Sequence, residues 1–139
     1  NLLLNVGPRG DGTINDIQTE LLLGMGRWLE INGEAIYGSR VHAVQSGETR
    51  EGHDVHYTAK QEPDRVYAIL LGKPGDVVTF DAADLPELRP SDRVHLLSAP
   101  PQLNWRQVGD EVRVAIPRGV DLGEQPAYVF RFQRHGIPS

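Results

Sequence analysis

From residue 39 onward, apolar and polar side chains alternate with a period of two in a series of short segments. This alternation is typical of strands that turn one face to a core and the other to water. Gly and Pro turn signals separate most of the segments, so we expect a mainly β chain that forms an antiparallel β-sandwich of about eight strands. The predicted strands cover residues 40–45, 54–59, 65–71, 76–80, 93–98, 104–108, 111–116 and 126–132.

The first 38 residues follow a different pattern. Residues 2–6 are an apolar run without alternation, as expected for a strand covered on both faces. Residues 7–13 are rich in Gly and Pro and predict a loop. Helical spacing follows, because apolar residues at i, i+4, i+8, i+11 and i+12 share one face. The predicted face consists of Ile17, Leu21, Met25, Trp28 and Leu29.

Both ends of this helix have sequence signals. Asn15 or Asp16 can cap its N-terminus, and the Asn-Gly pair at 32–33 indicates its end. Gly24 and Gly26 lie inside it, and each costs about 1 kcal/mol relative to Ala. Tight packing of the helix against a neighbouring element would explain both glycines.

Composition excludes several classes of function. The chain has 139 residues, enough for one or two small domains, and a formal charge of −5. Its 14 Lys and Arg are scattered, without the basic stripe and interleaved aromatics that nucleic-acid binding requires. No apolar run approaches the roughly 18 residues that span a bilayer. Cysteine is absent, which excludes disulfides and thiolate metal sites and leaves the compartment undetermined.

The N-terminal pattern resembles a known family. Residues 2–14 read LLLNVGPRGDGTI, and residues 27–38 read RWLEINGEAIYG. Both segments resemble glycoside hydrolase family 29, the α-L-fucosidases. In that family they form the last strand of the catalytic (β/α)8 barrel and the helix that closes it. The resemblance implies that residues 1–38 are a strand–loop–helix unit from an incomplete barrel, and that the chain opens inside a domain.

The second half resembles the same family. The segments at 66–75, 93–98, 103–105 and 127–132 are similar to strands of its C-terminal β-sandwich, which implies that residues 39–139 are that domain. One departure is Ser-Arg-Val-His at 39–42, where the family more often has Thr-Arg-Pro-Trp.

The resemblance implies a C-terminal fragment of a retaining exo-α-L-fucosidase, which removes terminal fucose in two displacement steps without a metal or organic cofactor. The family's Asp nucleophile and its fucose-binding histidines and Trp lie on earlier strands, so no catalytic residue is carried over to this chain. We expect the chain alone to be inactive. Its partner would be the missing catalytic barrel, or a second copy joined through the N-terminal strand, which cannot satisfy its own backbone groups.

Retaining glycosidases need two carboxyl groups about 5–5.5 Å apart, so the carboxylates of the N-terminal unit are candidates for catalysis. Asp16 and Glu20 are four residues apart on the predicted helix, where capping and solvation explain them. We interpret Asp11 as a support for the loop and Glu34 as a support for the helix end. Glu30 completes the set of candidates.

Two residues are candidates for substrate binding. Asn5 lies at the C-terminal end of the predicted barrel strand, the face where barrel active sites lie, although a polar tie for the next loop explains it equally well. Trp105 can stack on a sugar ring, but alternating strands use aromatics mainly as core. The alternative function is a free-standing module, without catalysis, that binds a fucosylated glycan or self-assembles. His53 and His56 are too few for a zinc site, which needs three or four ligands.

Overall fold

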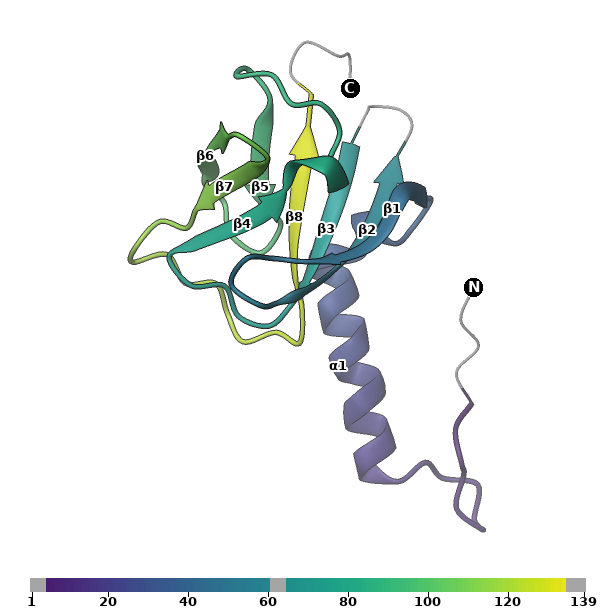
Figure 1. Cartoon of the computed structure of the whole chain (residues 1–139). Coiled ribbons are helices and arrows are strands. Elements are labelled where there is room, and N and C mark those ends of the chain that lie inside the picture. The colour runs from purple at the N-terminus through teal and green to yellow at the C-terminus, as the bar shows by residue number, and fades with distance from the viewer. Residues whose placement is uncertain (1–4, 61–64, 135–139) are drawn as a thin grey trace.

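Eight strands and one long helix follow one another in a computed structural model that describes residues 5–60 and 65–134 (Figure 1). The helix α1 comes first and is followed by a short 3-10 turn, η1, and then by the strands; a second turn, η2, lies between β4 and β5. The elements are α1 (Asp16–Asn32), η1 (Gly33–Ala35), β1 (Arg40–Glu48), β2 (Asp54–Lys60), β3 (Arg65–Leu71), β4 (Val77–Asp81), η2 (Ala82–Asp84), β5 (Arg93–Leu96), β6 (Gln102–Val108), β7 (Glu111–Ala115) and β8 (Tyr128–Gln133).

All neighbouring strands pair antiparallel, in the order β1-β2-β3-β8-β5-β6-β7-β4. The sheet curls at β6, whose first residues pair with β5 and whose later residues pair with β7. This divides it into a layer of β1, β2, β3, β8 and β5 and a second layer of β6, β7 and β4. The predicted antiparallel sandwich is therefore confirmed, with its two layers joined through one shared strand.

The eight predicted strands are all present, and only their ends differ. β1 continues to Glu48 through an irregularity in pairing between Val41 and Ser46. β5 ends at Leu96 because the backbone N–H of Ala99 donates to the Leu96 carbonyl and closes a turn there. The predicted tight hairpin joins β6 to β7, with Val108 opposite Glu111 and the intervening Gly109 at a φ of 60°, in the left-handed region that glycine tolerates.

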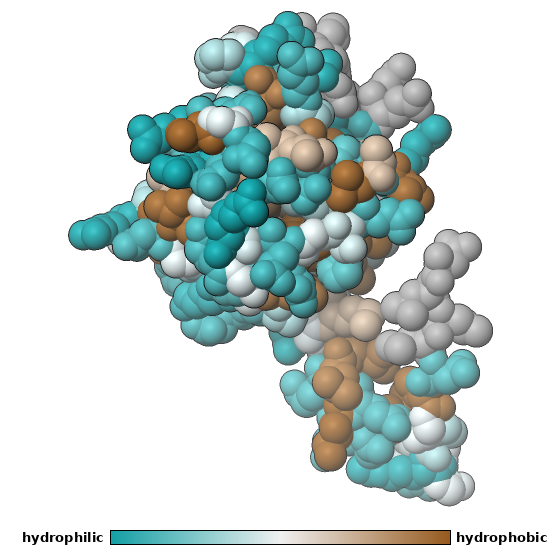
Figure 2. Space-filling model, in the orientation of Figure 1, coloured by the Kyte–Doolittle hydropathy of each residue, from teal (hydrophilic) through white to brown (hydrophobic). Residues whose placement is uncertain are grey.

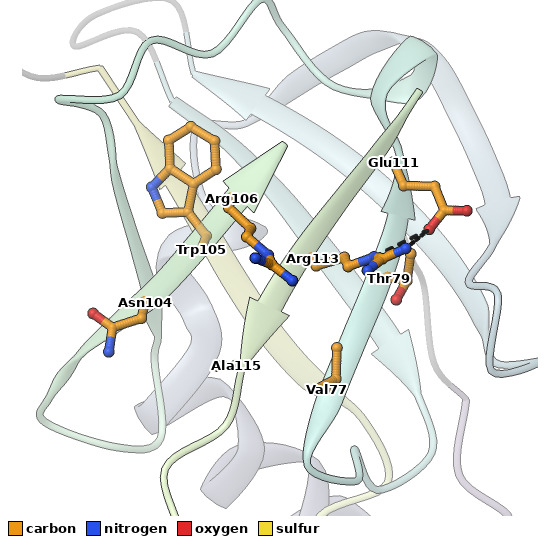
Figure 3. A pocket seen from close by; sticks show the side chains of 8 residues that line it. All are labelled: Val77, Thr79, Asn104, Trp105, Arg106, Glu111, Arg113 and Ala115. Atoms are coloured by element: carbon orange, nitrogen blue, oxygen red, sulfur yellow. Dashed lines mark hydrogen bonds and ion pairs between the residues drawn. The ribbon is translucent and has the colours of Figure 1, made fainter. Parts of the chain in front are cut away.

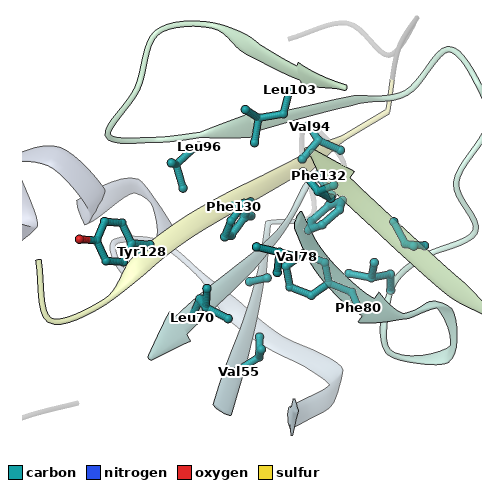
Figure 4. Packing of buried hydrophobic residues seen from close by; sticks show 14 of the residues in the cluster. Val55, Leu70, Val78, Phe80, Val94, Leu96, Leu103, Tyr128, Phe130 and Phe132 are labelled. Atoms are coloured by element: carbon teal, nitrogen blue, oxygen red, sulfur yellow. The ribbon is translucent and has the colours of Figure 1, made fainter. Parts of the chain in front are cut away.

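The core lies between the two layers (Figure 4). Phe80 of β4 meets Phe130 and Phe132 of β8 edge to face, with ring centroids 5.4 Å apart in both pairs. This geometry is favourable because the positive edge of one ring approaches the negative face of the other. All three rings are buried. The aromatic cluster therefore joins the second layer to the centre of the first.

The helix α1 begins where the sequence indicates. The Oδ1 of Asn15 accepts the backbone N–H of Gln18 at 2.8 Å, so Asn15 is the N-cap and Asp16 is the first helical residue. The helix ends at the predicted Asn-Gly pair and continues as η1. Its C-terminal end packs against the sandwich, while its N-terminal half projects away from it (Figure 1).

The N-terminal unit is described only in part. The strand expected over residues 2–6 falls mostly on residues 1–4, which lie outside the described residues, and residues 5–7 are not in a strand. No described residue packs tightly against the helix glycines, so the expected close packing stays a prediction. A Cβ added at Gly26 would meet nothing within 4 Å, and one at Gly24 would meet only Arg27 of the same helix. Within the described ranges, no helix is long and apolar enough to cross a membrane.

We predict that Phe130→Ala lowers the free energy of unfolding by about 3–5 kcal/mol, because it leaves a cavity at the contact between the layers. Val41→Ala, on a strongly exposed side chain of edge strand β1, is the control and should change it by no more than about 0.5 kcal/mol. Urea unfolding followed by tryptophan fluorescence measures both. Equal effects of the two substitutions would contradict this description of the core.

Candidate functional site

Glu34 joins the end of the helix to the first layer of the sandwich. Its Oε2 accepts the hydroxyl of Tyr67 at 2.7 Å, and both carboxylate oxygens accept from Nη1 of Arg131 at 3.1 Å. Tyr67 and Arg131 are directly opposed on β3 and β8, and Arg65 places a further Nη1 at 3.8 Å from Oε2. One carboxylate in η1 thus binds two neighbouring strands, and the predicted role of Glu34 as a helix-end support is confirmed.

The ionisation of this cluster suits a structural tie. Partial burial alone would raise the pKa of Glu34, but the hydrogen bonds from Tyr67 and Arg131 and the charges of Arg131 and Arg65 outweigh it and lower that pKa. Burial, followed by the hydrogen bond to Glu34, raises the pKa of Tyr67 to about 12. At neutral pH Glu34 is therefore ionised and Tyr67 is protonated. A glycosidase acid needs the opposite shift, a raised carboxyl pKa.

Apolar contacts and backbone acceptors complete this junction. Ala35 is fully buried, and its carbonyl accepts the hydroxyl of Thr58 at 2.7 Å. The indole Nε1 of Trp28 donates to the Ala127 carbonyl at 2.9 Å, and Nδ2 of the buried Asn32 donates to Oε1 of Gln125 at 2.8 Å. These bonds tie the helix end to the sandwich, although Oδ1 of Asn32 is buried without a hydrogen-bond partner among the described residues, and a small apolar cluster surrounds them. The cluster contains Ala35, Tyr67, Ile69, Ala127 and Val129, with Trp28 and Leu97 against it.

The loop before the helix is held by Asp11. Its Oδ1 accepts the hydroxyl of Thr13 at 2.7 Å and the backbone N–H of Thr13 at 3.0 Å. These two hydrogen bonds, the side-chain one first, lower the pKa of Asp11. The predicted role of Asp11 as a loop support is confirmed, and its carboxylate is engaged within its own turn.

The predicted apolar face of α1 is exposed over its first turns. Ile17 is 75% exposed, Leu21 69% and Met25 41%. Figure 2 shows hydrophobic side chains running along the projecting helix. Only the C-terminal part of the face, at Trp28, reaches the sandwich. The spacing therefore predicted the face correctly, but the described residues of this chain do not cover most of it.

The two predicted sugar-contact residues are not brought together. Asn5 is exposed in the segment that precedes the loop and α1, whereas Trp105 lies in β6 on the sandwich. Trp105 is partly buried against the core, and its Nε1 donates to the Asp92 carbonyl at 2.9 Å. The rest of its indole borders a hollow on the surface.

This hollow, of about 530 Å³, lies over the outer face of the second layer (Figure 3). Its basic residues, Arg106 and Arg113, were not among the sequence candidates. The predicted hairpin could have shown that these two arginines are neighbours. A two-residue turn at 109–110 places Val108 opposite Glu111, and the same register places Arg106 opposite Arg113. The residues around the hollow are Val77, Thr79, Asn104, Trp105, Arg106, Glu111, Arg113 and Ala115.

The carboxylates at two of the surface hollows are already engaged. Glu111 is the one carboxylate at the hollow over the second layer, and its Oε2 lies 3.3 Å from Nη2 of Arg113. Asp76 and Asp121 border another depression, but Asp76 pairs with Arg118 at 3.8 Å and Asp121 accepts the backbone N–H of Gly123. In the part of the chain that the structure describes, no group of three or more His, Cys, Asp or Glu could hold a metal ion.

Comparison with known proteins identifies the family. Residues 1–34 match the profile described as Alpha-L-fucosidase, and residues 48–133 match the Alpha-L-fucosidase C-terminal domain. Together these segments cover most of the chain. The chain therefore belongs to the α-L-fucosidase family of glycoside hydrolases, and it carries a C-terminal portion of that family's sequence.

Individual relatives support the same family assignment. Tissue alpha-L-fucosidase of Rattus norvegicus is 42% identical over 108 residues, which are 77% of this chain and 22% of that protein. Alpha-L-fucosidase of Branchiostoma floridae is 39% identical over 118 residues, 84% of this chain and 25% of that protein. The crystal structure of Thermotoga maritima alpha-fucosidase in complex with fucose is 34% identical, with a TM-score of 0.79 over 95% of this chain and 30% of that chain. The chain thus spans about a quarter of the curated relatives it matches.

We predict that Glu34→Gln lowers the free energy of unfolding at pH 7 by about 2 kcal/mol, because charge-assisted hydrogen bonds are lost at a partly exposed site. Folding lowers the pKa of Glu34 below its ordinary value of 4.5, so the unfolded chain takes up the proton first as the solution is acidified. The stability from the ionised carboxylate is full above about pH 4.5 and is lost as the pH falls through the folded pKa. The gap between wild type and variant should therefore shrink in acid.

Urea unfolding at a series of pH values measures this gap. Glu30→Gln, on α1 and exposed, is the matched control and should leave stability nearly unchanged at every pH. A gap for Glu34→Gln that stays constant down to strongly acidic pH would show that the carboxylate is not the stabilising group.

Proposed function

We propose that this chain is the C-terminal part of a retaining exo-α-L-fucosidase, and that it supplies scaffold rather than the catalytic carboxylates. Residues 1–38 would be the closing strand and helix of the barrel, and residues 39–139 the sandwich that supports it. The observation that carries this proposal is the division of the matches, in which residues 1–34 align with the Alpha-L-fucosidase profile and residues 48–133 with its C-terminal domain. The Thermotoga maritima relative, described in complex with fucose, supports fucose as the substrate sugar.

The exposed face of α1 supports a barrel as the partner. Burying a side chain such as Ile17, Leu21 or Met25 fully is worth about 1.5–3 kcal/mol, so three such residues left in water favour an apolar partner. The glycines of this helix fit the same partner. The open space around Gly26 would let another backbone approach closely.

The hydrogen bonds and ion pairs of three carboxylates support the proposal that this chain does not supply the catalytic groups. Retaining hydrolysis needs a nucleophile and an acid/base on either side of the bond that is cleaved. Asp11 is bound to Thr13, Glu34 to Tyr67 and Arg131, and Glu111 to Arg113. In the complete enzyme the reacting carboxyl groups would come from other strands of the barrel. Asn5, placed after the last barrel strand, would border the sugar pocket from its floor.

We predict that the chain alone releases no nitrophenol from 4-nitrophenyl α-L-fucoside above the uncatalysed rate, because Asp11 and Glu34, the carboxylates of the family motifs, are engaged in hydrogen bonds and the reacting pair would lie on other strands of the barrel. Thermotoga maritima alpha-fucosidase serves as the positive control under the same conditions. Turnover by the purified chain that survives repeated purification would overturn the scaffold assignment.

The same exposed face favours self-association when no barrel is present. We predict that the chain forms oligomers at micromolar concentration, and that Ile17→Glu combined with Leu21→Glu makes it monomeric, because two charges in the apolar contact would be desolvated. Thr19→Glu, on the opposite side of the same helical turns, is the control and should leave the oligomers intact. Sedimentation velocity measures all three proteins. A wild-type monomer at these concentrations would remove the support for an apolar docking face.

A further inference from the structure

The outer face of the second layer presents a regular arrangement of polar side chains. The pairing of β6, β7 and β4 places Arg106, Arg113 and Thr79 in one cross-strand row. The adjacent row contains Asn104, Ala115 and Val77. Because side chains alternate along each strand, both rows project from the same side of the sheet, away from the core. Figure 3 shows them around the hollow, with the two guanidinium groups on one side of the ribbon.

Charge in this face is unbalanced. Like charges directly opposed on neighbouring antiparallel strands destabilise a sheet. Arg113 is partly neutralised by Glu111, whose Oε2 lies 3.3 Å from both its Nε and its Nη2. The guanidinium of Arg106 makes no hydrogen bond or ion pair with any residue of the described ranges, and neither does the side-chain amide of Asn104. An anion between the two arginines would relieve their repulsion.

The charges around the two arginines are balanced by neighbouring carboxylates, except at Arg106. Glu111 is shared with Arg50, whose Nε lies 3.9 Å from its Oε1, and Nη2 of Arg50 lies 3.9 Å from Oδ2 of Asp110. Glu51 lies beside the same row, because its Oε1 accepts the backbone N–H of Thr79 at 2.7 Å. The three arginines are therefore balanced by three carboxylates, and Arg106 is the arginine among them that has no partner in the described ranges. One unpartnered guanidinium suits one oxoanion and does not suit a long polyanion, which binds through many phosphate contacts.

Trp105 and Arg106 border two hollows at once. The second hollow, of about 330 Å³, lies beside the free edge of β6 and is also bordered by Leu88, Pro90 and Gln107. The hydrogen bond from Trp105 to the Asp92 carbonyl fixes the indole, so its exposed part is held in place before any ligand arrives. An immobilised aromatic surface beside hydrogen-bonding side chains fits a ring that has both C–H and hydroxyl groups. The volume of the larger hollow lies within the usual range of small-molecule sites.

We propose that this face of the sandwich is a binding site for an anionic saccharide, a sugar that carries a carboxylate or a sulfate ester. The oxoanion lies between Arg106 and Arg113, whose planar donors match its geometry. The ring lies beside Trp105, with the exposed Asn104 available to its hydroxyls. The site is on the second layer, whereas α1 packs against the outer face of the first. It therefore goes beyond the proposed fucosidase function and does not depend on it.

The test is an NMR titration of the ¹⁵N-labelled chain with four probes. Methyl glucuronide offers a carboxylate, galactose 6-sulfate a sulfate ester, methyl galactoside no charge, and sodium sulfate an anion without a sugar. The chain contains two tryptophans, so the indole of Trp28, at the helix junction, is an internal control for that of Trp105. We expect one or both acidic sugars to shift the Trp105 indole and leave that of Trp28 in place, with affinity that falls as salt is added.

Variants then assign the contact. Arg106→Gln should weaken binding of the acidic sugar at least about tenfold, as loss of one charge-assisted pair predicts. Arg106→Lys should weaken it less, because it keeps the charge and loses the planar fork. Arg118→Gln, at an exposed arginine paired with Asp76 outside this site, should have no effect. Unchanged far-UV circular dichroism confirms that the variants are folded.

The two acidic probes distinguish the sources of the oxoanion, and binding of either supports the site. The proposal is overturned if neither shifts the Trp105 indole, if the neutral galactoside binds as well, or if Arg106→Gln binds as tightly as wild type. It is also overturned if sodium sulfate binds as tightly as the sugars, which would indicate an adventitious ion only. None of these outcomes bears on hydrolysis of fucosides, so the two proposals fail separately.

Discussion

The carboxylate of Glu34 determines how the two parts of this chain are held together. It lies at the end of α1 and accepts hydrogen bonds from Tyr67 on β3 and Arg131 on β8, which are paired in the sheet. The direction in which the helix leaves the sandwich follows from this tie and from the indole of Trp28 bound to the Ala127 carbonyl. The hydrogen bonds and positive charges of the cluster lower the pKa of Glu34, so the carboxylate that makes the tie is ionised at neutral pH. The apolar face of the helix is thereby presented away from the sandwich at a fixed angle, which is what a buttress between two domains requires.

The two outer faces of the sandwich differ in what covers them. The outer face of the first layer receives the helix end through the small cluster around Ala35 and Val129. The outer face of the second layer carries Arg106 and Arg113 and remains open to solvent. The core between them is dominated by the contact of Phe80 with Phe130 and Phe132, so substitutions on either outer face leave the interior packing intact. This separation is compatible with both proposals, because the support of a barrel and the binding of a saccharide would use different faces of the sandwich.

Much of this architecture can be predicted from local patterns in the sequence. The period-two alternation located all eight strands, and the i, i+4 spacing located α1 and its apolar face, because both depend on neighbours within a few residues. The N-cap was ambiguous, since Asn15 and Asp16 are both good caps, and the bond from the Gln18 N–H decides between them. The curl at β6 and the partners of Glu34 were not predictable, because Arg131 is 97 residues away from Glu34 in the chain. That Arg106 lies opposite Arg113 could be predicted from the register of the β6–β7 hairpin.

The central claim is that the groups which attack and protonate a fucoside are supplied by polypeptide other than these 139 residues. The most direct measurement is the intact mass of the chain after incubation with 2-fluoro-fucosyl fluoride, which forms a long-lived ester with the nucleophile of a retaining fucosidase. The account predicts an unmodified mass under conditions that fully label an active fucosidase. A stoichiometric fucosyl adduct mapped to any carboxylate of this chain would contradict it.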